Sequence, residues 1–397
     1  MGGPLQGIRV VEIGTLIAAP FAARLMAEFG AEVIKIEAPV TGDPLRKWRK
    51  LHDGTSLWWY LQSRIKKSIC VNLKSPDGVE VVKRLAADAD VIIENLRPGA
   101  LEKLGLGWDV LHAINPKLTM VRISGYGQTG PYRDRPGFGA IGEAMGGIRY
   151  TTGEADGAPA RVGVSLGDSL ASLHGVIGAL MSLLRVKTGQ GDGQVVDVSL
   201  VESVFNLMES LVPEYDLLGH VRERSGGALP GIAPSNTYRT EDEGFVVIAG
   251  NSDPIFRRLM HVIGRPDLAD DPALAHNDGR AAQCAMLDEA ITAWTSHHAT
   301  EDVLAALDRA EVPAGRIYSV ADIVADPHYR ARGMLLEADL PGGSKVKMPG
   351  IVPKLSDTPG EVRWQGPALG EHTGSVLGDL GFDSEAIERL RREGAVQ

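Results

Sequence analysis

The chain has 397 residues, a length that favours two or more domains. Its formal charge of −10 argues against general nucleic-acid binding, and no run of about 18 apolar residues predicts a membrane span. The N-terminus shows no signal-peptide pattern, so we expect a cytoplasmic protein. Two cysteines cannot form a disulfide framework, and no His or Cys cluster has zinc-site spacing, so we expect no metal.

Residues 1–125 alternate between strand and helix patterns. Strands separated by helices predict right-handed crossovers and a Rossmann-like parallel sheet, which binds ligands at the carboxyl ends of its strands. The first loop after a strand, Gly14–Pro20, has one glycine where the dinucleotide fingerprint needs three, so we do not expect NAD. No phosphate-cradling loop of the ATP-binding type occurs either. The expected strands are 8–13, 32–37, 68–72, 90–95 and 118–124, and the expected helices are 21–29 and one from Ser75.

Asp168 stands between a segment that reads as extended, 160–165, and a helical apolar pattern. The helix is expected to bury one face, formed by Leu170, Leu173, Ile177, Leu180 and Leu184. Asp168 would then be the N-cap at a strand-to-helix turn, where free N–H groups and the helix dipole hold a carboxylate ionised. Such a carboxylate can act as a covalent nucleophile, although most Asp residues at this position are caps only.

The rest of the chain predicts a second domain and a return. A Gly/Pro-rich break at 225–235 precedes a hairpin-like segment, and three helical patterns follow it. They lie near 253–263, 280–297 and 300–310, and the last helix is expected at 384–393. We therefore expect a large Rossmann-like domain over 1–224, a smaller α+β domain over 225–330, and a C-terminal segment, 331–397, that returns to the large domain.

Charge is unevenly distributed along the chain. Residues 1–104 hold 15 Lys and Arg against 12 Asp and Glu, whereas the whole chain is acidic. A locally basic N-terminal part suits a small polyanionic ligand such as a phosphorylated cofactor.

Seven short strings occur in order between residue 5 and about residue 390. They are Leu5-x-Gly-Ile-Arg-Val-Val-Glu12, Gly30-Ala-Glu-Val-Ile-Lys-Ile-Glu37, Lys66-Lys-Ser-Ile-Cys-Val-Asn-Leu-Lys74, Glu94-Asn-Leu-Arg-Pro-Gly99, Gly125-Tyr-Gly-Gln-Thr-Gly-Pro131, Gly167-Asp-Ser169 and Gly370-Glu-His-Thr373. Together they resemble the family III CoA-transferases, the formyl-CoA and carnitine CoA-transferase group.

The resemblance implies a reaction and an assembly. The matching Asp168 attacks an acyl-CoA thioester to give an aspartyl mixed anhydride, then carries CoA as an aspartyl thioester to an acceptor acid. CoA thioesters are substrates, no cofactor is tightly bound, and two ring-shaped subunits interlock as a homodimer. No nucleic-acid or membrane partner is expected. The implied CoA contacts are Ile17, Ala18, Asn72, Lys74, Asn95, Leu96 and Lys103.

The resemblance also implies substrate contacts. They are Trp48 in the acyl pocket, Arg46 as partner of a distal carboxylate, Phe138, and Gly250 with Asn251 in place of a glycine-rich lid. Gly139 replaces the Asp or Glu of many members, with Glu143 as the candidate substitute, and Pro136 replaces a CoA-binding lysine. We therefore do not expect formyl-CoA and oxalate, the substrates of formyl-CoA transferase, to be the substrates of this protein. The 125–131 string looks more like members that use succinyl-CoA and short dicarboxylic or hydroxy acids.

Three other functions stay open. An acyl-CoA epimerase of the same fold needs an acid/base pair where this chain has Tyr126 and Gly127. A serine hydrolase could use Ser165 in Gly163-Val-Ser-Leu-Gly167 with His372 as base, but no glycine-rich oxyanion motif lies upstream. A non-catalytic acyl-CoA binding module would leave Asp168 unexplained. CoA transfer is the function we favour.

Overall fold

The computed structural model describes residues 2–397, and its contacts divide the chain into two units. The first unit runs up to Ile148, continues over Val162–Glu209 and returns over Ala331–Gln397; the second comprises Arg149–Arg161 and Ser210–Arg330. The chain leaves the first unit after Glu209, which is earlier in the sequence than the boundary that we expected after residue 224. It returns to the first unit at Ala331. As independently folding domains, the ranges remain a prediction.

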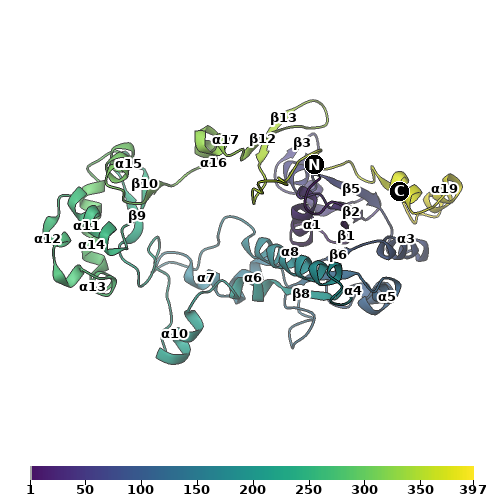
Figure 1. Ribbon diagram of the computed structural model, residues 1–397, viewed down its shortest axis with the longest axis horizontal. Helices are drawn as coiled ribbons and strands as arrows, with labels where there is room; N and C mark the ends of the chain where they lie inside the picture. The colour runs from purple at the N-terminus through teal and green to yellow at the C-terminus, as the bar shows by residue number, and fades with distance from the viewer. Residues whose placement is uncertain (1) are drawn as a thin grey trace. The chain divides into compact units, whose positions relative to one another are not determined.

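The first unit is built on a six-stranded sheet in which every pairing is parallel (Figure 1). The strand order is β5-β2-β1-β6-β7-β8. The strands are β1 (Arg9–Glu12), β2 (Glu32–Glu37), β5 (Lys66–Cys70), β6 (Val91–Glu94), β7 (Thr119–Ser124) and β8 (Val195–Ser199). All five expected strands are confirmed. β8 was missed, because its short run lies between a Gly-rich turn and a helix.

Alternate residues of the strands face two helical layers, as the two-residue period of a strand requires. One face packs against α1 (Ala18–Glu28) and α8 (Leu166–Lys187), and the other against α3 (Pro76–Ala87) and α5 (Trp108–Ile114). The C-terminal helices α18 (Thr373–Asp379) and α19 (Ser384–Arg392) complete the second face. The first face uses Val10, Val33, Ile93 and Val121, and the second uses Val11, Ile34, Ile92 and Met120.

The start of α8 differs from the prediction in two respects. Residues 160–165 form no strand, and Val164 is exposed, so the apolar character of this segment does not reflect burial in a sheet. Ser165 is the N-cap, and Asp168 is the third residue of the helix. The expectation of Asp168 as an N-cap at a strand-to-helix turn was therefore wrong. The carboxylate still lies in the first turn, where backbone N–H groups lack helical partners.

The predicted buried face of α8 was also wrong. Ile177 is 49% exposed and Leu184 is 64% exposed, and Leu173 and Leu180 are exposed with them. Small residues are buried instead, including Gly167, Ala171, Gly175 and Ala179. They bring the helix so close to the sheet that a Cβ on Gly178 would lie 2.4 Å from Val196 Cγ1.

Among residues 2–397, α8 is the one helix that is long and apolar enough, by length and composition, to cross a membrane. One such helix is weak evidence for a membrane span.

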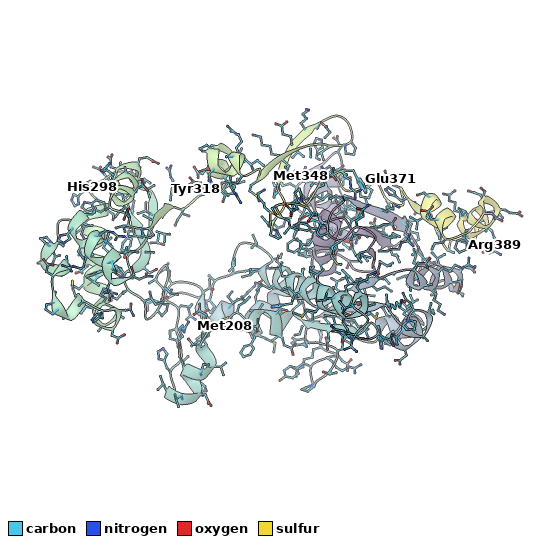
Figure 2. All side chains as sticks on the ribbon, viewed as in Figure 1. Met208, His298, Tyr318, Met348, Glu371 and Arg389 are labelled. Carbon is cyan, nitrogen blue, oxygen red and sulfur yellow. The ribbon has the colours of Figure 1, made fainter. Side chains whose placement is uncertain are left out.

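The second unit is α+β. Its antiparallel sheet consists of β9 (Ser235–Arg239), β10 (Phe245–Ala249) and β11 (Ala314–Arg316) in the order β11-β10-β9. The hairpin expected after residue 235 is confirmed. The helix expected over 280–297 is broken at Gln283, and His298, labelled in Figure 2, follows its second part. The helices are α11 (Asp253–Val262), α12 (Pro266–Ala269), α13 (Asn277–Ala282), α14 (Cys284–Thr295) and α15 (Thr300–Arg309).

A separate hairpin of the first unit consists of β12 (Leu335–Asp339) and β13 (Lys345–Pro349). It carries Met348, which is labelled in Figure 2 and is buried in a small cluster with Leu45, Trp59 and Tyr60. The remaining elements are η1 (Pro44–Lys47), β3 (Leu51–His52), β4 (Thr55–Ser56), α2 (Leu57–Gln62), α4 (Ala100–Lys103), α6 (Gly139–Met145), α7 (Ile148–Thr151), α9 (Leu200–Phe205), α10 (Leu211–Leu218), η2 (Pro272–Leu274), α16 (Val320–Ala325) and α17 (Pro327–Ala331).

Candidate active site

The implied CoA contacts gather at the carboxyl edge of the sheet. Ile17 and Ala18 follow β1, Asn95 and Leu96 follow β6, and Asn72 follows β5. The chain order reverses between the neighbouring strands β1 and β6, which is where open α/β sheets bind ligands.

Asn95 joins the two loops at this reversal. Its side-chain oxygen accepts the Thr15 N–H at 2.9 Å, and its amide nitrogen donates to the Thr15 carbonyl at 2.9 Å. Asn95 thus holds the loop after β1 in place. The two implied phosphate partners, Lys74 and Lys103, are exposed to solvent.

Asp168 lies against a bare stretch of backbone. A Cβ added to Gly139, the first residue of α6, would lie only 2.0 Å from Asp168 Oδ2. The carboxylate therefore occupies the space that any side chain at position 139 would need. Phe138, one of the expected substrate contacts, precedes this glycine and is 70% exposed.

Glu143 is buried one turn further along α6, and its Oε1 accepts the Gly167 N–H at 3.3 Å. A second carboxylate is therefore bonded to the backbone one residue before Asp168. Whether Glu143 replaces the acid that is missing at Gly139 stays a prediction.

Ser172 connects the candidate nucleophile to the candidate CoA loop. Its hydroxyl oxygen lies 2.7 Å from the Asp168 carbonyl and 2.7 Å from the Ala18 carbonyl, and the side chain is fully buried. The first turns of α8 and α1 are thereby adjacent. Sequence reasoning missed Ser172, because a serine inside an apolar helix gives no sign of which backbone it reaches.

Arg46 is engaged within the protein. Its Nε lies 2.8 Å from Glu37 Oε2 and its Nη2 lies 2.7 Å from Glu37 Oε1, and its guanidinium stacks 3.7 Å above the Trp59 ring. A substrate carboxylate would have to displace Glu37 from this bidentate pair, so these contacts favour a structural role for Arg46. Trp48 is the C-cap of η1 and is 41% exposed, which is compatible with a residue that lines an acyl pocket.

The Arg46–Glu37 pair predicts a pH dependence of stability. Burial alone would raise the pKa of Glu37, but the Arg46 hydrogen bond and nearby positive charges outweigh burial and hold this pKa below its usual value. Because the folded-state pKa is depressed, the stabilisation is complete above the unfolded pKa near 4.5 and is lost as the pH falls.

Glu37→Gln should therefore destabilise the protein at pH 7 by about 3–5 kcal/mol, the cost of breaking a buried pair. The decrease in the thermal midpoint should be clearly smaller near the acid limit of stability. Equal decreases at both pH values would contradict the assignment.

A buried ionic cluster lies beneath the loop after β1. Lys35 Nζ is 2.6 Å from Glu12 Oε1 and 2.8 Å from Asp43 Oδ2, while Lys66 Nζ is 2.7 Å from Glu12 Oε2. Burial, together with the charge of Lys35, lowers the pKa of Lys66 to about 8. Glu12 and Lys35 lie inside two expected strands, and Lys66 lies two residues before the strand expected over 68–72. Sequence reasoning did not use these charges.

Gly250 and Asn251 belong to the second unit, between β10 and α11. The Gly250 N–H donates to the Pro234 carbonyl at 2.9 Å, and the Asn251 carbonyl accepts from Arg280 Nη2 at 2.8 Å. Both residues are thus anchored by their backbones within this unit. Their role as a lid over the substrate stays a prediction.

The hydrolase hypothesis finds no support in the hydrogen bonds. His372 Nδ1 accepts the Ser68 N–H at 3.3 Å, on the edge strand β5, and burial lowers the pKa of His372. Within residues 2–397, no hydrogen bond joins His372 to Ser165. At the position of the epimerase pair, Gly127 has a left-handed φ of 87° and Tyr126 stacks edge-on against Tyr132.

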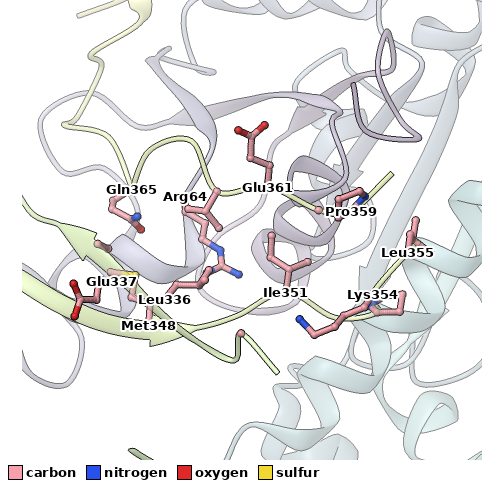
Figure 3. A pocket seen from close by; sticks show the side chains of 15 residues that line it. Arg64, Leu336, Glu337, Met348, Ile351, Lys354, Leu355, Pro359, Glu361 and Gln365 are labelled. Atoms are coloured by element: carbon pink, nitrogen blue, oxygen red, sulfur yellow. The ribbon is translucent and has the colours of Figure 1, made fainter. Parts of the chain in front are cut away.

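Within residues 2–397, no group of His, Cys, Asp and Glu side chains could hold a metal ion. A cavity of about 510 Å³ lies under the β12–β13 hairpin, where Arg64, Ile351, Lys354 and Glu361 line it (Figure 3). It shares no lining residue with the candidate site.

Comparison with known proteins identifies the class of this fold and site. Residues 5–373 match the model of CoA-transferase family III. The chain belongs to this family and is an enzyme of the CoA-transferase class.

Two relatives and one solved structure illustrate the similarity. The chain is 50% identical over 378 residues to the succinyl-CoA–D-citramalate CoA-transferase of Chloroflexus aurantiacus, covering 95% of this chain and 94% of the relative. It is 44% identical to the beta subunit of succinyl-CoA–L-malate CoA-transferase from the same organism, covering 98% and 97%. The crystal structure of a CAIB/BAIF family protein from Brucella suis superposes with a TM-score of 0.83 at 35% identity, covering 96% and 100%.

Proposed function

We propose that the protein transfers CoA from succinyl-CoA to a short dicarboxylic acid that carries a hydroxyl group. The relatives named above, at 50% and 44% identity, are named for succinyl-CoA with D-citramalate and with L-malate. The structural observation that carries the proposal is the Ser172 hydroxyl, which lies 2.7 Å from both the Asp168 and Ala18 carbonyls. It supports a thioester bound on the loop after β1 beside a carboxylate that can attack it.

The first half-reaction removes the acyl group from CoA. An Asp168 carboxylate oxygen attacks the thioester carbonyl, so that a C–O bond forms, the C–S bond breaks, and the CoA thiolate leaves behind a succinyl-aspartyl anhydride. The thiolate then attacks the aspartyl carbonyl. A new C–S bond forms, the anhydride C–O bond breaks, and succinate leaves.

The second half-reaction reverses these steps with the acceptor. Its carboxylate attacks the aspartyl thioester and releases the thiolate, which then attacks the acceptor carbonyl and frees the Asp168 carboxylate. One thioester is broken and one is made, so no energy source is needed. Water must be excluded, because it would hydrolyse the anhydride.

The position of Asp168 suits this chemistry. In the first turn of a helix, free N–H groups and the helix dipole favour the ionised carboxylate. Because Gly139 has no side chain, the carboxylate can lie directly against the backbone at the start of α6.

The substrates can be tested directly. Purified protein is incubated with succinyl-CoA and, separately, with citramalate, malate, glutarate, oxalate or acetate, and the acyl-CoA products are identified by mass spectrometry. We expect new thioesters with the hydroxy-dicarboxylic acids and little with oxalate or acetate. Release of free CoA and succinate without a new thioester would point to hydrolysis and would sink the proposal.

Two exposed lysines supply a prediction about CoA binding. If Lys74 and Lys103 meet CoA phosphates, replacing either by Ala should weaken CoA binding by about 1–3 kcal/mol. The loss should shrink for a pantetheine thioester that lacks the nucleotide. Lys117→Ala, at the amino edge of the sheet before β7, serves as the control. Calorimetry that finds equal losses for both ligands would show that the lysines act elsewhere.

We further propose an interlocked homodimer. The exposed apolar side chains along α8 include Leu173, Ile177, Leu180 and Leu184, and such a contiguous face is typical of an interface. The second unit also exposes Leu217 and Leu218 on α10. These surfaces support association, and the interlocking itself rests on the family resemblance.

The assembly predicts two results. Wild-type protein should sediment as a dimer at micromolar concentration, and the Ile177→Asp/Leu184→Asp variant should not. Two differently tagged dimers should form no mixed species until they are unfolded and refolded together, because threaded subunits cannot separate while folded. A monomeric wild-type protein would refute the proposal.

We propose finally that no cofactor is tightly bound and that the protein acts in the cytoplasm. Native mass spectrometry of the purified protein and cell fractionation test these two points.

A further inference from the structure

One buried carboxylate joins the loop after β1 to the turn after β2. Asp43 is 1% exposed, and its Oδ1 accepts the Leu45 N–H at 2.8 Å, at the start of η1. The same oxygen accepts the Leu16 N–H at 3.0 Å. Leu16 directly precedes Ile17 and Ala18, the implied CoA contacts.

The backbone of Leu16 needs such a support. Its φ is +66°, in the left-handed region that a leucine rarely adopts. A conformation of this kind persists only where the surrounding structure holds it, and such residues cluster at functional sites.

Lys35 fixes the Asp43 carboxylate from the other side. Its Nζ lies 2.8 Å from Asp43 Oδ2, 2.6 Å from Glu12 Oε1 and 2.9 Å from the Gly14 carbonyl. Two points of the loop after β1, at Gly14 and at Leu16, are therefore tied to one Lys35–Asp43 pair. Burial alone would raise the pKa of Asp43, but the charge of Lys35 holds it below its usual value, so the pair is ionised.

Asp43 also contacts the turn that carries Trp48, the residue implied to line the acyl pocket. η1 begins at Pro44, directly after Asp43, and its C-cap is Trp48. The Asp43 N–H donates to Glu37 Oε2 at 2.9 Å, and Glu37 pairs with Arg46 of η1, so the turn is held at both ends.

We propose that Asp43 is a positioning residue for CoA transfer: it sets the loop of residues 16–18 against the turn that carries Trp48, so that a bound thioester reaches Asp168 in one register. Asp43 need not touch the substrate. The inference rests on the proposed function for its substrate and on the contacts above for its geometry.

The test compares two buried carboxylates that differ in what they hold. The Asp43 carboxylate has two oxygens that accept from Lys35 and from two backbone N–H groups. In Asp43→Asn one oxygen is replaced by an amide N–H₂ group, which cannot accept, and the negative charge is lost. The control, Glu28→Gln, removes an equally buried charge near the C-terminus of α1, paired with Arg64 at 2.6 Å and Arg24 at 3.1 Å. Both variants should lower the thermal midpoint.

Only Asp43→Asn should affect the site. We expect deuterium uptake to rise in peptides covering 13–17 and 44–48, and kcat/KM for succinyl-CoA to fall on the order of 10- to 100-fold, as a small misplacement of a substrate can cause. The double variant Asp43→Asn/Leu16→Gly should recover part of this loss, because glycine adopts a positive φ without strain.

The outcomes separate the two proposals. Wild-type protein without transfer activity removes the proposed function, and CoA affinity measured by calorimetry then decides the role of Asp43. If Asp43→Asn binds CoA more weakly than the wild type and Glu28→Gln does not, the result supports that role. Equal kcat/KM and equal affinity in Asp43→Asn and Glu28→Gln would overturn it.

Discussion

Asp168→Ala should abolish CoA transfer, lowering kcat by roughly 10⁴-fold or more, the scale seen when a covalent nucleophile is removed. Its fold and CoA affinity should stay close to those of the wild type, because the half-buried carboxylate forms bonds with substrate rather than packing in a core. Asp168→Asn should be equally inactive, since an amide keeps the shape but is a poor nucleophile.

Ser165→Ala is the matched control for this prediction. Ser165 caps the same helix without a side-chain capping bond, so its loss should be mild for folding and for transfer. Steady-state kinetics on the three variants distinguish the hypotheses. An active Asp168→Ala protein together with an inactive Ser165→Ala protein would favour the hydrolase hypothesis.

Gly139→Ala should lower kcat on the order of 10²-fold with little effect on stability. The new Cβ would stand 2.0 Å from Asp168 Oδ2, whereas ordinary contact begins at 3.4 Å, so the carboxylate has to move by more than 1 Å. The clash is with the end of a flexible side chain, so the protein can relieve it by rotating Asp168 away. The fold is kept and the nucleophile is misplaced.

Gly163→Ala controls for the general effect of a methyl group near the site. A Cβ at Gly163 would meet no atom within 4 Å, so this variant should keep its activity. Kinetics and thermal unfolding of both variants provide the comparison. Full activity in Gly139→Ala would show that transfer does not require the carboxylate position seen here.

The sequence predicted the parallel sheet well because short runs rich in Val and Ile recur between helical patterns. It predicted the wrong face of α8, since large apolar residues usually mark the buried side. Here Gly175 and Ala179 face the sheet, and the leucines of the helix are exposed on its other side. A single sequence cannot show whether an apolar stripe packs within its own chain or outside it.

The candidate site was only partly readable from the sequence. The loops that hold Ile17, Asn72 and Asn95 could be placed at one edge, because the carboxyl ends of parallel strands meet there. The contact of Gly139 with Asp168 and that of Ser172 with Ala18 join residues far apart in the chain, and no local pattern reveals them.

In the proposed mechanism Asp168 becomes covalently acylated. Wild-type protein is mixed with succinyl-CoA in the absence of an acceptor, quenched in acid, digested and examined by mass spectrometry, with Asp168→Asn treated in parallel. We predict that the peptide carrying Asp168 gains the mass of a succinyl group or of CoA, and that the Asp168→Asn peptide does not. An unmodified Asp168 peptide from a protein that still transfers CoA, or an adduct on another residue, would contradict the mechanism.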